Sequence, residues 1–75
     1  MKIQILLNSE TDVAEFIKVT SRYPHDLDIK AGGYEVDAKS LLGVLGTALQ
    51  RKAELKVHAD SMEGLEKISR YIVTE

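Results

Sequence analysis

Ser40 is the residue in this sequence whose type and position best fit a chemical role. It follows Asp37, Ala38 and Lys39 and precedes the mostly apolar run at 41–46, Leu-Leu-Gly-Val-Leu-Gly. This pattern predicts a short helix that begins at the serine, whose hydroxyl caps the first free backbone N–H groups. A phosphate on the same oxygen would lie where the helix dipole favours negative charge. The serine is therefore a candidate for regulatory phosphorylation, although capping alone also explains it.

The apolar residues that follow this serine cannot all face one core on a short helix. Val44 is expected to be buried, because it lies three residues from Leu41 and can point at a sheet. Leucines clustered at a helix start are better explained by a partner site than by scattered surface exposure. The candidate partner-binding residues are Lys39, Leu41, Leu42 and Leu45.

The two histidines, His25 and His58, are the other side chains that could transfer a phosphoryl group or bind a metal. His25 follows Pro24 in an expected loop, and His58 lies on the expected outward side of a strand. Both are therefore interpreted as ordinary surface residues. Two distant histidines in a chain without cysteine do not make a metal site. The sequence predicts no catalytic residue, no metal and no cofactor.

Size and composition predict one domain over residues 1–75, since a chain of 75 residues with 44% hydrophobic content has room for a single core. We expect a monomer or a weak homodimer. Ten basic residues against twelve acidic ones leave no basic excess, which argues against a nucleic-acid partner. The apolar start at 1–7 is too short for a signal sequence, and no run reaches membrane-spanning length. We therefore expect a cytoplasmic protein with no membrane partner.

Hydropathy patterns predict the elements that position these residues. Residues 2–7 alternate as a half-buried strand does, and a helix is expected to begin near Ser9 or Thr11 and to end by Tyr23, before Pro24. Two short strands at 27–30 and 34–36 are joined through a glycine hairpin. The helix at Ser40 should run to about Leu45 or Ala48.

The last predicted elements are a strand over 54–59 and a final helix that begins at Asp60 or Ser61 and runs to about Val73. Its expected apolar stripe is Leu65, Ile68 and Ile72, with charged pairs at i and i+4 on its outer face, Glu63 with Lys67 and Glu66 with Arg70. The order β-α-β-β-α-β-α favours an open-faced α+β sandwich. Its solvent-facing side is expected to carry Lys2, Gln4, Asp28, Lys30, Glu35, Lys56 and His58.

Residues 38–45, Ala-Lys-Ser-Leu-Leu-Gly-Val-Leu, resemble the regulatory-serine segment of the HPr family, the small phosphocarriers of the bacterial phosphotransferase system. The resemblance extends from about Val13 to Val73. It implies an HPr-like open-faced β-sandwich, in which a four-stranded antiparallel sheet is covered on one face by three helices. It also implies that Ser40 is phosphorylated with ATP and that Leu41, Leu42 and Leu45 form the patch that meets partner proteins.

One part of the family pattern is missing. The family's phosphotransfer histidine lies at the start of the first helix and is followed two residues later by arginine and then proline. Here Ser9 takes the place of the histidine, and Thr11 and Asp12 take the places of the arginine and proline. Phosphohistidine transfer needs an imidazole nucleophile and a cation, whereas Glu10, Asp12 and Glu15 would repel phosphate. We therefore interpret Ser9, Thr11 and Asp12 as a degenerate active-site position.

The sequence thus predicts a non-enzymatic HPr-like protein that acts by docking and is switched by phosphorylation of Ser40. The resemblance implies HPr kinase/phosphorylase as the kinase and a sugar-responsive transcriptional regulator as the partner. Two alternatives stay open. One is a small ligand-binding regulatory domain of ferredoxin-like type, which would have sheet order 4-1-3-2. The other is a constitutive protein-interaction module that is indifferent to the state of Ser40.

Overall fold

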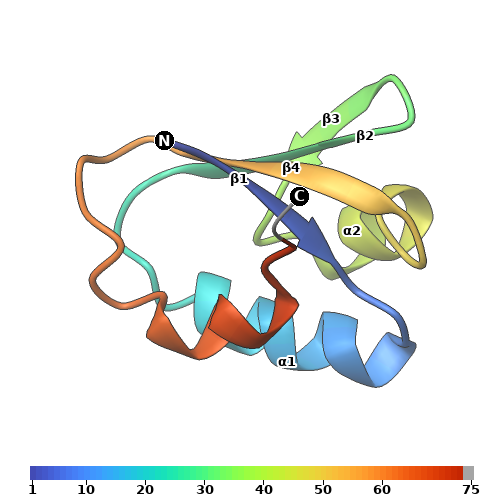
Figure 1. Ribbon diagram of the computed structural model, residues 1–75, viewed down its shortest axis with the longest axis horizontal. Coiled ribbons are helices and arrows are strands. Elements are labelled where there is room, and N and C mark those ends of the chain that lie inside the picture. The colour runs from blue at the N-terminus through green and yellow to red at the C-terminus, as the bar shows by residue number, and fades with distance from the viewer. Residues whose placement is uncertain (74–75) are drawn as a thin grey trace.

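Residues 1–73, which the structure describes, form a sheet on one side and a layer of helices on the other (Figure 1). In this computed structural model the elements are, in chain order, β1 (Lys2–Leu6), α1 (Glu10–Thr20), β2 (Leu27–Ala31), β3 (Tyr34–Asp37), α2 (Leu41–Thr47), β4 (Lys52–Val57) and the 3-10 helix η1 (Glu66–Tyr71). None of the helices in these residues is both long and apolar enough to span a bilayer.

The four strands are ordered β1-β4-β2-β3, and every neighbouring pair is antiparallel. In the centre of the sheet, Leu55 of β4 lies opposite Ile3 of β1 on one side and Ile29 of β2 on the other. This confirms the predicted α+β fold with a four-stranded antiparallel sheet. The observed strand order differs from the order 4-1-3-2, so the ferredoxin-like alternative is wrong.

Side chains alternate between the two faces of the sheet, as the sequence predicts. The inner face carries Ile5, Leu27, Ile29, Leu55 and Val57, each at most 3% exposed. Helices cover only this face of the sheet, so the strands alternate between apolar residues that point inward and polar residues that point to solvent. All seven side chains predicted for the outer face are exposed or half-buried.

Two ion pairs cross the outer face. The Lys56 ammonium lies 2.8 Å from a Glu35 carboxylate oxygen, so that a side chain of β4 reaches over β2 to β3. This hydrogen bond lowers the pKa of Glu35 and raises that of Lys56. His58 Nε2 lies 2.8 Å from an Asp28 carboxylate oxygen. Both pairs are solvent-accessible, so they contribute little to stability.

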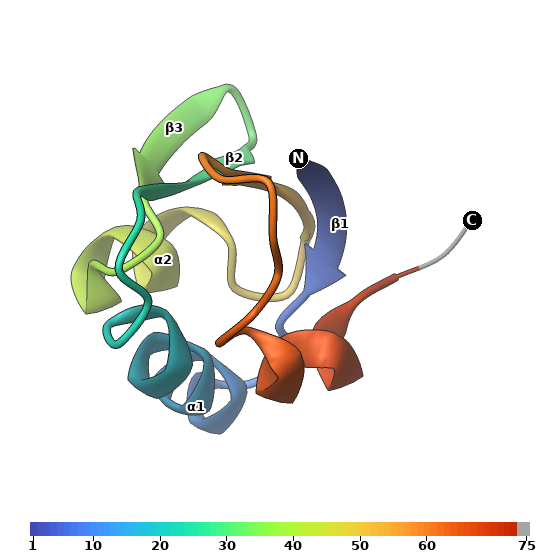
Figure 2. The ribbon, with the colours of Figure 1, turned by 90° about the vertical axis from the view of Figure 1, so that its left-hand side faces the viewer.

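The helices pack on the inner face, with α1 between α2 and η1 (Figure 2). α1 buries Val13, Phe16 and Thr20, which follow one another at helical spacing. The Phe16 ring meets the Tyr71 ring of η1 edge to face, with centroids 6.4 Å apart. α1 ends at Thr20, three residues before the predicted limit at Tyr23, because residues 21–23 turn back through N–H bonds to the carbonyls of the last helical turn.

The final helix is shorter than predicted and of a different type. Residues 58–65 are irregular, and the stretch Glu66–Tyr71 is a 3-10 helix. A continuous helix from Asp60 or Ser61 fails because Gly64 has φ +96° and because the Ser61 hydroxyl accepts from Glu63 N, closing a local turn. The predicted pair of Glu63 with Lys67 is therefore not a helical pair, since Glu63 precedes the helix.

The buried stripe of this helix follows the period of three that a 3-10 helix imposes. Leu65, Ile68 and Tyr71 are buried, whereas Ile72 is 36% exposed. The predicted stripe through Ile72 was wrong at its last position, because the prediction assumed the 3.6-residue period of an α-helix. Ile72 instead forms a bridge to Ile5, and Val73 N donates to Gln4 O, so that the chain pairs with the free side of β1.

The last strand also differs from its prediction, beginning at Lys52 and ending at Val57 rather than spanning 54–59. Ala53 lies opposite Ile5 and is buried, so the sheet starts before the residues with the strongest alternating pattern. After Val57 the chain leaves the sheet, and His58 N donates to Asp26 O. The first strand ends at Leu6, and buried Leu7 forms an isolated bridge to Leu49.

Tyr23 connects three segments that are far apart in the chain. Its hydroxyl donates to Ser61 O over 2.7 Å, and its carbonyl accepts from the Lys39 ammonium over 2.7 Å. Its buried ring packs beside Gly64, where an added Cβ would lie 3.5 Å from the ring. Tyr23 therefore fixes the irregular segment before η1 and the loop before α2 to the end of α1.

We expect Tyr23→Phe to lower the free energy of unfolding by about 1 kcal/mol, because it leaves the half-buried Ser61 carbonyl without its hydroxyl donor. Tyr34→Phe is the matched control, since Tyr34 is 67% exposed at the hairpin and should change stability very little. Urea unfolding followed by circular dichroism measures both. Equal effects of the two substitutions would contradict the role assigned to Tyr23.

Candidate functional site

Ser40 caps helix α2, as the sequence predicts. Its backbone is extended, with φ −97° and ψ 113°, and its hydroxyl oxygen accepts from Gly43 N over 3.2 Å. Its carbonyl accepts the first intrahelical bond, from Val44 N over 3.0 Å. The side chain is half-buried. The hydroxyl oxygen therefore lies at the N-terminus of the helix, beside N–H groups that have no partner within it.

The loop before Ser40 is held from several directions. Ala38 is fully buried, its N–H donates to Leu27 O over 2.9 Å, and its carbonyl accepts from the Thr20 hydroxyl over 2.9 Å. An Asp37 carboxylate oxygen accepts from Lys39 N, also over 2.9 Å. These contacts fix the backbone of residues 37–39 in one position, so the serine is presented from a rigid support.

Lys39 was predicted as a partner-binding residue, and the structure shows what its ammonium contacts. The side chain is half-buried and lies against the end of α1, where Nζ donates to Tyr23 O. The charge is therefore directed toward a backbone carbonyl of the fold.

The leucines beside Ser40 divide between solvent and core. Leu42 is 81% exposed and Leu41 is 46% exposed, while Leu45 is half-buried and packs against the core. Val44 is fully buried, which confirms the predicted inward residue of this helix. The apolar surface at this site thus consists mainly of Leu41 and Leu42, with the edge of Leu45 next to them.

Gly43 has a structural role that the sequence patterns do not indicate. A Cβ added there would lie 3.2 Å from the Ser40 hydroxyl oxygen and 3.3 Å from Val36 Cβ of β3. The glycine therefore lets α2 approach β3 closely while the capping hydroxyl stays in place. A Cβ added at Gly46 would meet no other heavy atom within 4 Å.

The predicted degenerate site lies at the start of the other helix, α1. Ser9 is the N-cap, its hydroxyl accepts from Asp12 N over 3.1 Å, and Asp12 Oδ2 accepts from Asn8 N over 3.1 Å. This reciprocal arrangement resembles a capping box. Thr11 is exposed on the first turn. The cluster brings together two oxygen-bearing side chains that already satisfy backbone donors, with acidic residues Glu10 and Asp12 in the first turn.

The two histidines lie elsewhere. His58 pairs with Asp28 on the outer face of the sheet, and the His25 ring meets the Tyr23 ring edge to face with centroids 5.5 Å apart. Among residues 1–73, no three His, Asp or Glu side chains gather in a way that could hold a metal ion. Ser40, Leu41 and Leu42 thus lie together at the start of α2, whereas His58 lies on the outer face of the sheet and His25 contacts Tyr23, the residue that binds Lys39.

Comparison with known proteins assigns the family. The family model described as "PTS HPr component phosphorylation site" matches residues 12–73. This chain belongs to the HPr family. Of the residues at the start of α1, Asp12 lies inside the match, and Ser9 and Thr11 precede it.

Individual HPr-like proteins agree with this assignment. The HPr-like protein Crh of Bacillus subtilis (strain 168) is 31% identical over 65 residues, which cover 83% of this chain and 76% of Crh. The fold is shared with the HPr-C-His structure from Thermoanaerobacter tengcongensis, at TM-score 0.73 and 17% identity over 93% of this chain and 88% of that one. It is also shared with phosphocarrier protein HPr from Bacillus anthracis str. Ames, at TM-score 0.72 and 20% identity over 97% and 96%.

The two glycines of α2 should respond differently to alanine. Gly46→Ala should raise the free energy of unfolding by about 0.5 to 1 kcal/mol, because alanine favours helix and the added methyl meets open space. Gly43→Ala should lower it, because the methyl presses on Ser40 and Val36. Urea unfolding compares the two variants. Equal stabilisation by both would show that the close approach at Gly43 is not constrained.

Proposed function

We propose that this HPr-family protein is a regulatory docking protein, switched by phosphorylation of Ser40, and that it does not carry phosphohistidine. The observation that carries the proposal is the placement of an N-capping serine directly beside two exposed leucines, Leu41 and Leu42. A capping hydroxyl that is half-buried but at the surface edge can take a phosphoryl group, and the leucines supply apolar contact area for a partner.

A phosphate on Ser40 would change this surface strongly. It adds about −1.5 to −2 charges and three acceptor oxygens on the atom that now lies 3.2 Å from Gly43 N. Negative charge at this position is favoured by the N–H groups of the first helical turn. The neighbouring Asp37 carboxylate opposes it, although that carboxylate is turned toward Lys39 N. A partner would therefore combine Arg or Lys side chains for the phosphate with an apolar pocket for Leu42.

The start of α1 supports the proposal that this chain does not carry phosphohistidine. In place of an imidazole nucleophile it has Ser9, whose hydroxyl caps the helix, and the adjacent Asp12 carboxylate already accepts from Asn8 N. Neither group offers a nitrogen that could hold a phosphoryl group, and the first-turn carboxylates disfavour an incoming phosphate. The chain is thus proposed to be a non-enzymatic member of a family of phosphocarriers.

We propose a cytoplasmic regulatory role for this chain, which is similar to the HPr-like protein Crh. We propose HPr kinase/phosphorylase as the kinase and a sugar-responsive transcriptional regulator as the partner. A constitutive interaction module remains the competing proposal for the same leucines. It predicts that binding of the regulator is the same before and after Ser40 is phosphorylated.

Incubation with HPr kinase/phosphorylase and ATP should place a single phosphate on Ser40, identified by tandem mass spectrometry. Ser40→Ala should lose the phosphate while remaining folded, because removing the cap costs about 0.5 to 2 kcal/mol. Ser9→Ala is the matched control, since it removes the cap of α1 and should be phosphorylated normally. A folded wild-type chain that takes up no phosphate, or takes it up elsewhere, would contradict the proposed switch.

Phosphoenolpyruvate together with the first enzyme of the phosphotransferase system should leave this chain unlabelled, because no histidine stands at the start of α1. The Bacillus anthracis phosphocarrier HPr serves as the positive control. Acid-labile phosphate found on His25 or His58 of this chain would overturn the assignment as a protein without phosphocarrier activity.

A further inference from the structure

A continuous groove runs between α1 and η1, away from the Ser40 site. It consists of two adjoining hollows of about 330 and 420 Å³ that share Glu15, Val19 and Lys67 in their walls. α1 packs against α2 on one side and against η1 on the other, so this groove and the leucines beside Ser40 lie on different sides of α1 (Figure 2).

The groove concentrates positive charge in an acidic protein. Its walls carry Lys18, Arg22, Lys67 and Arg70, whereas the net charge of the chain is −2. The two carboxylates in the walls, Glu15 and Glu66, do not balance them. Four of the ten basic residues in the sequence therefore face one groove.

Neither of these carboxylates binds a cation of the groove tightly. Both oxygens of Glu66 accept from Gly64 N, over 3.1 and 3.0 Å, and backbone hydrogen bonds from Glu66 itself and from Gly64 lower the pKa of this carboxyl. Glu15 pairs only loosely with Lys18, at 3.9 Å. Within residues 1–73, the side chains of Arg22, Lys67 and Arg70 form no hydrogen bond or ion pair. Three cations of the groove are thus available to an external anion.

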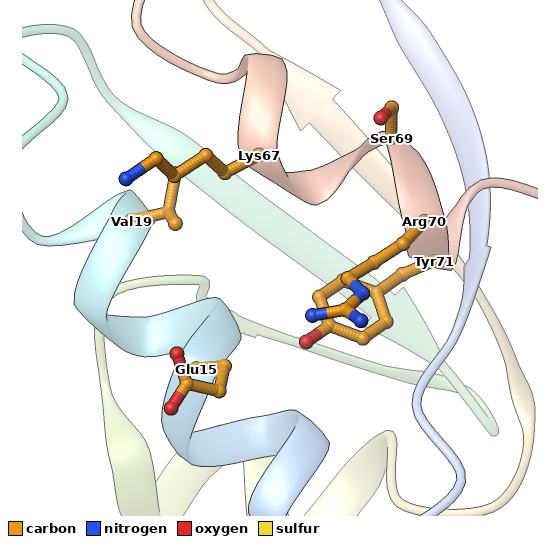
Figure 3. Close-up of a pocket in the computed structure, with 6 residues that line it drawn as sticks. All are labelled: Glu15, Val19, Lys67, Ser69, Arg70 and Tyr71. Atoms are coloured by element: carbon orange, nitrogen blue, oxygen red, sulfur yellow. The ribbon is translucent and has the colours of Figure 1, made fainter.

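The floor and spacing of the groove indicate the shape of that anion. Figure 3 shows Lys67 extending from η1 toward Val19 of α1, and the Arg70 guanidinium over the Tyr71 ring. The guanidinium carbon lies 5.8 Å from the ring centroid, which holds it in place. Lys18 and Arg22 line one hollow, Arg70 lines the other and Lys67 lines both, so the cations are spread along the groove and do not form the convergent donor set that a single phosphate needs.

The spacing of these cations matches an extended peptide. Lys18 lies in the last turn of α1 and Arg22 lies two residues after its end, whereas Lys67 and Arg70 lie three residues apart on η1, about 6 Å at the rise of a 3-10 helix. Alternate side chains of an extended chain are separated by about 7 Å on the same side. Carboxylates at every second residue could therefore meet the cations in turn while the backbone lies over Val19 and Tyr71.

We propose that the groove between α1 and η1 is a second docking surface, which binds an extended acidic segment of a partner protein. This surface does not depend on the state of Ser40. Its contacts are electrostatic and solvent-accessible, so its affinity is modest and falls as salt rises.

The probe is a synthetic peptide in which Glu and Ser alternate, titrated at low salt into the ¹⁵N-labelled protein while amide shifts are followed by NMR. The shifts should be concentrated in residues 15–22 and 64–71. The matched peptide with Gln in place of Glu should produce none. Shifts spread over the outer face of the sheet, or equal shifts with the Gln peptide, would overturn the proposal.

Variants separate this groove from general charge attraction. The double variant Arg22→Gln with Lys67→Gln removes two exposed charges and should weaken binding about tenfold. Lys2→Gln with Lys30→Gln removes two exposed charges from the outer face and should leave the affinity unchanged, as should Ser40→Ala. Equal weakening by both double variants would contradict the proposal that the peptide binds in the groove. Tighter binding of inorganic pyrophosphate than of the peptide would contradict the docking proposal and would indicate that the groove is a site for small anions.

Discussion

The hydrogen bond from the Thr20 hydroxyl to the Ala38 carbonyl is the constraint on which much of this small fold depends. Thr20 is the one fully buried polar side chain among residues 1–73, and Ala38 is equally inaccessible. The Thr20 hydroxyl also lies 3.3 Å from Ile17 O within α1, so the group that depends on this contact is the Ala38 carbonyl. A buried carbonyl without a donor costs about 1 to 3 kcal/mol, which favours the meeting of the end of α1 with the loop after β3. That loop leads directly into Ser40, and the position of the candidate site is thereby tied to the core.

A layer of three helices over one sheet face gives the molecule two separated surfaces with different chemistry. α2 offers a capped serine with exposed leucines, and the groove between α1 and η1 offers cations over an apolar floor. Tyr23 contributes to both, because its carbonyl holds Lys39 near Ser40 while its ring and hydroxyl hold the segment that precedes η1. The loop before Ser40 is hydrogen-bonded to α1 and β2, and the segment before η1 is hydrogen-bonded to Tyr23.

The sequence was informative where local patterns and tertiary structure agree. Alternation in the strands, the turn glycines at 32 and 33, the cap at Ser40 and the burial of Val44 could all be predicted, since each depends on residues close in sequence. The end of the chain was predicted poorly because its conformation depends on a distant residue. Tyr23 packs against Gly64, and its hydroxyl donates a hydrogen bond to Ser61 O. The hydropathy pattern of residues 58–73 alone does not predict these contacts.

The same distinction between local patterns and distant contacts applies to the candidate site. Ser40 and its leucines were identified from residue types, whereas the engagement of the Lys39 ammonium and the close approach at Gly43 depend on α1 and β3. The groove was not predicted, because Lys18 and Arg22 are separated from Lys67 and Arg70 by more than half of the chain, and each pair alone is typical of a solvated surface.

The pairing of β1 has a consequence for how the protein is made. This strand has no neighbour in the sheet until residues 52–57 exist, and within residues 1–73 its other side is paired with Ile72 and Val73. During synthesis β1 therefore stays unpaired until residues 52–57 have left the ribosome. Its charged and polar alternate positions, Lys2 and Gln4, then keep one face of the nascent strand compatible with water.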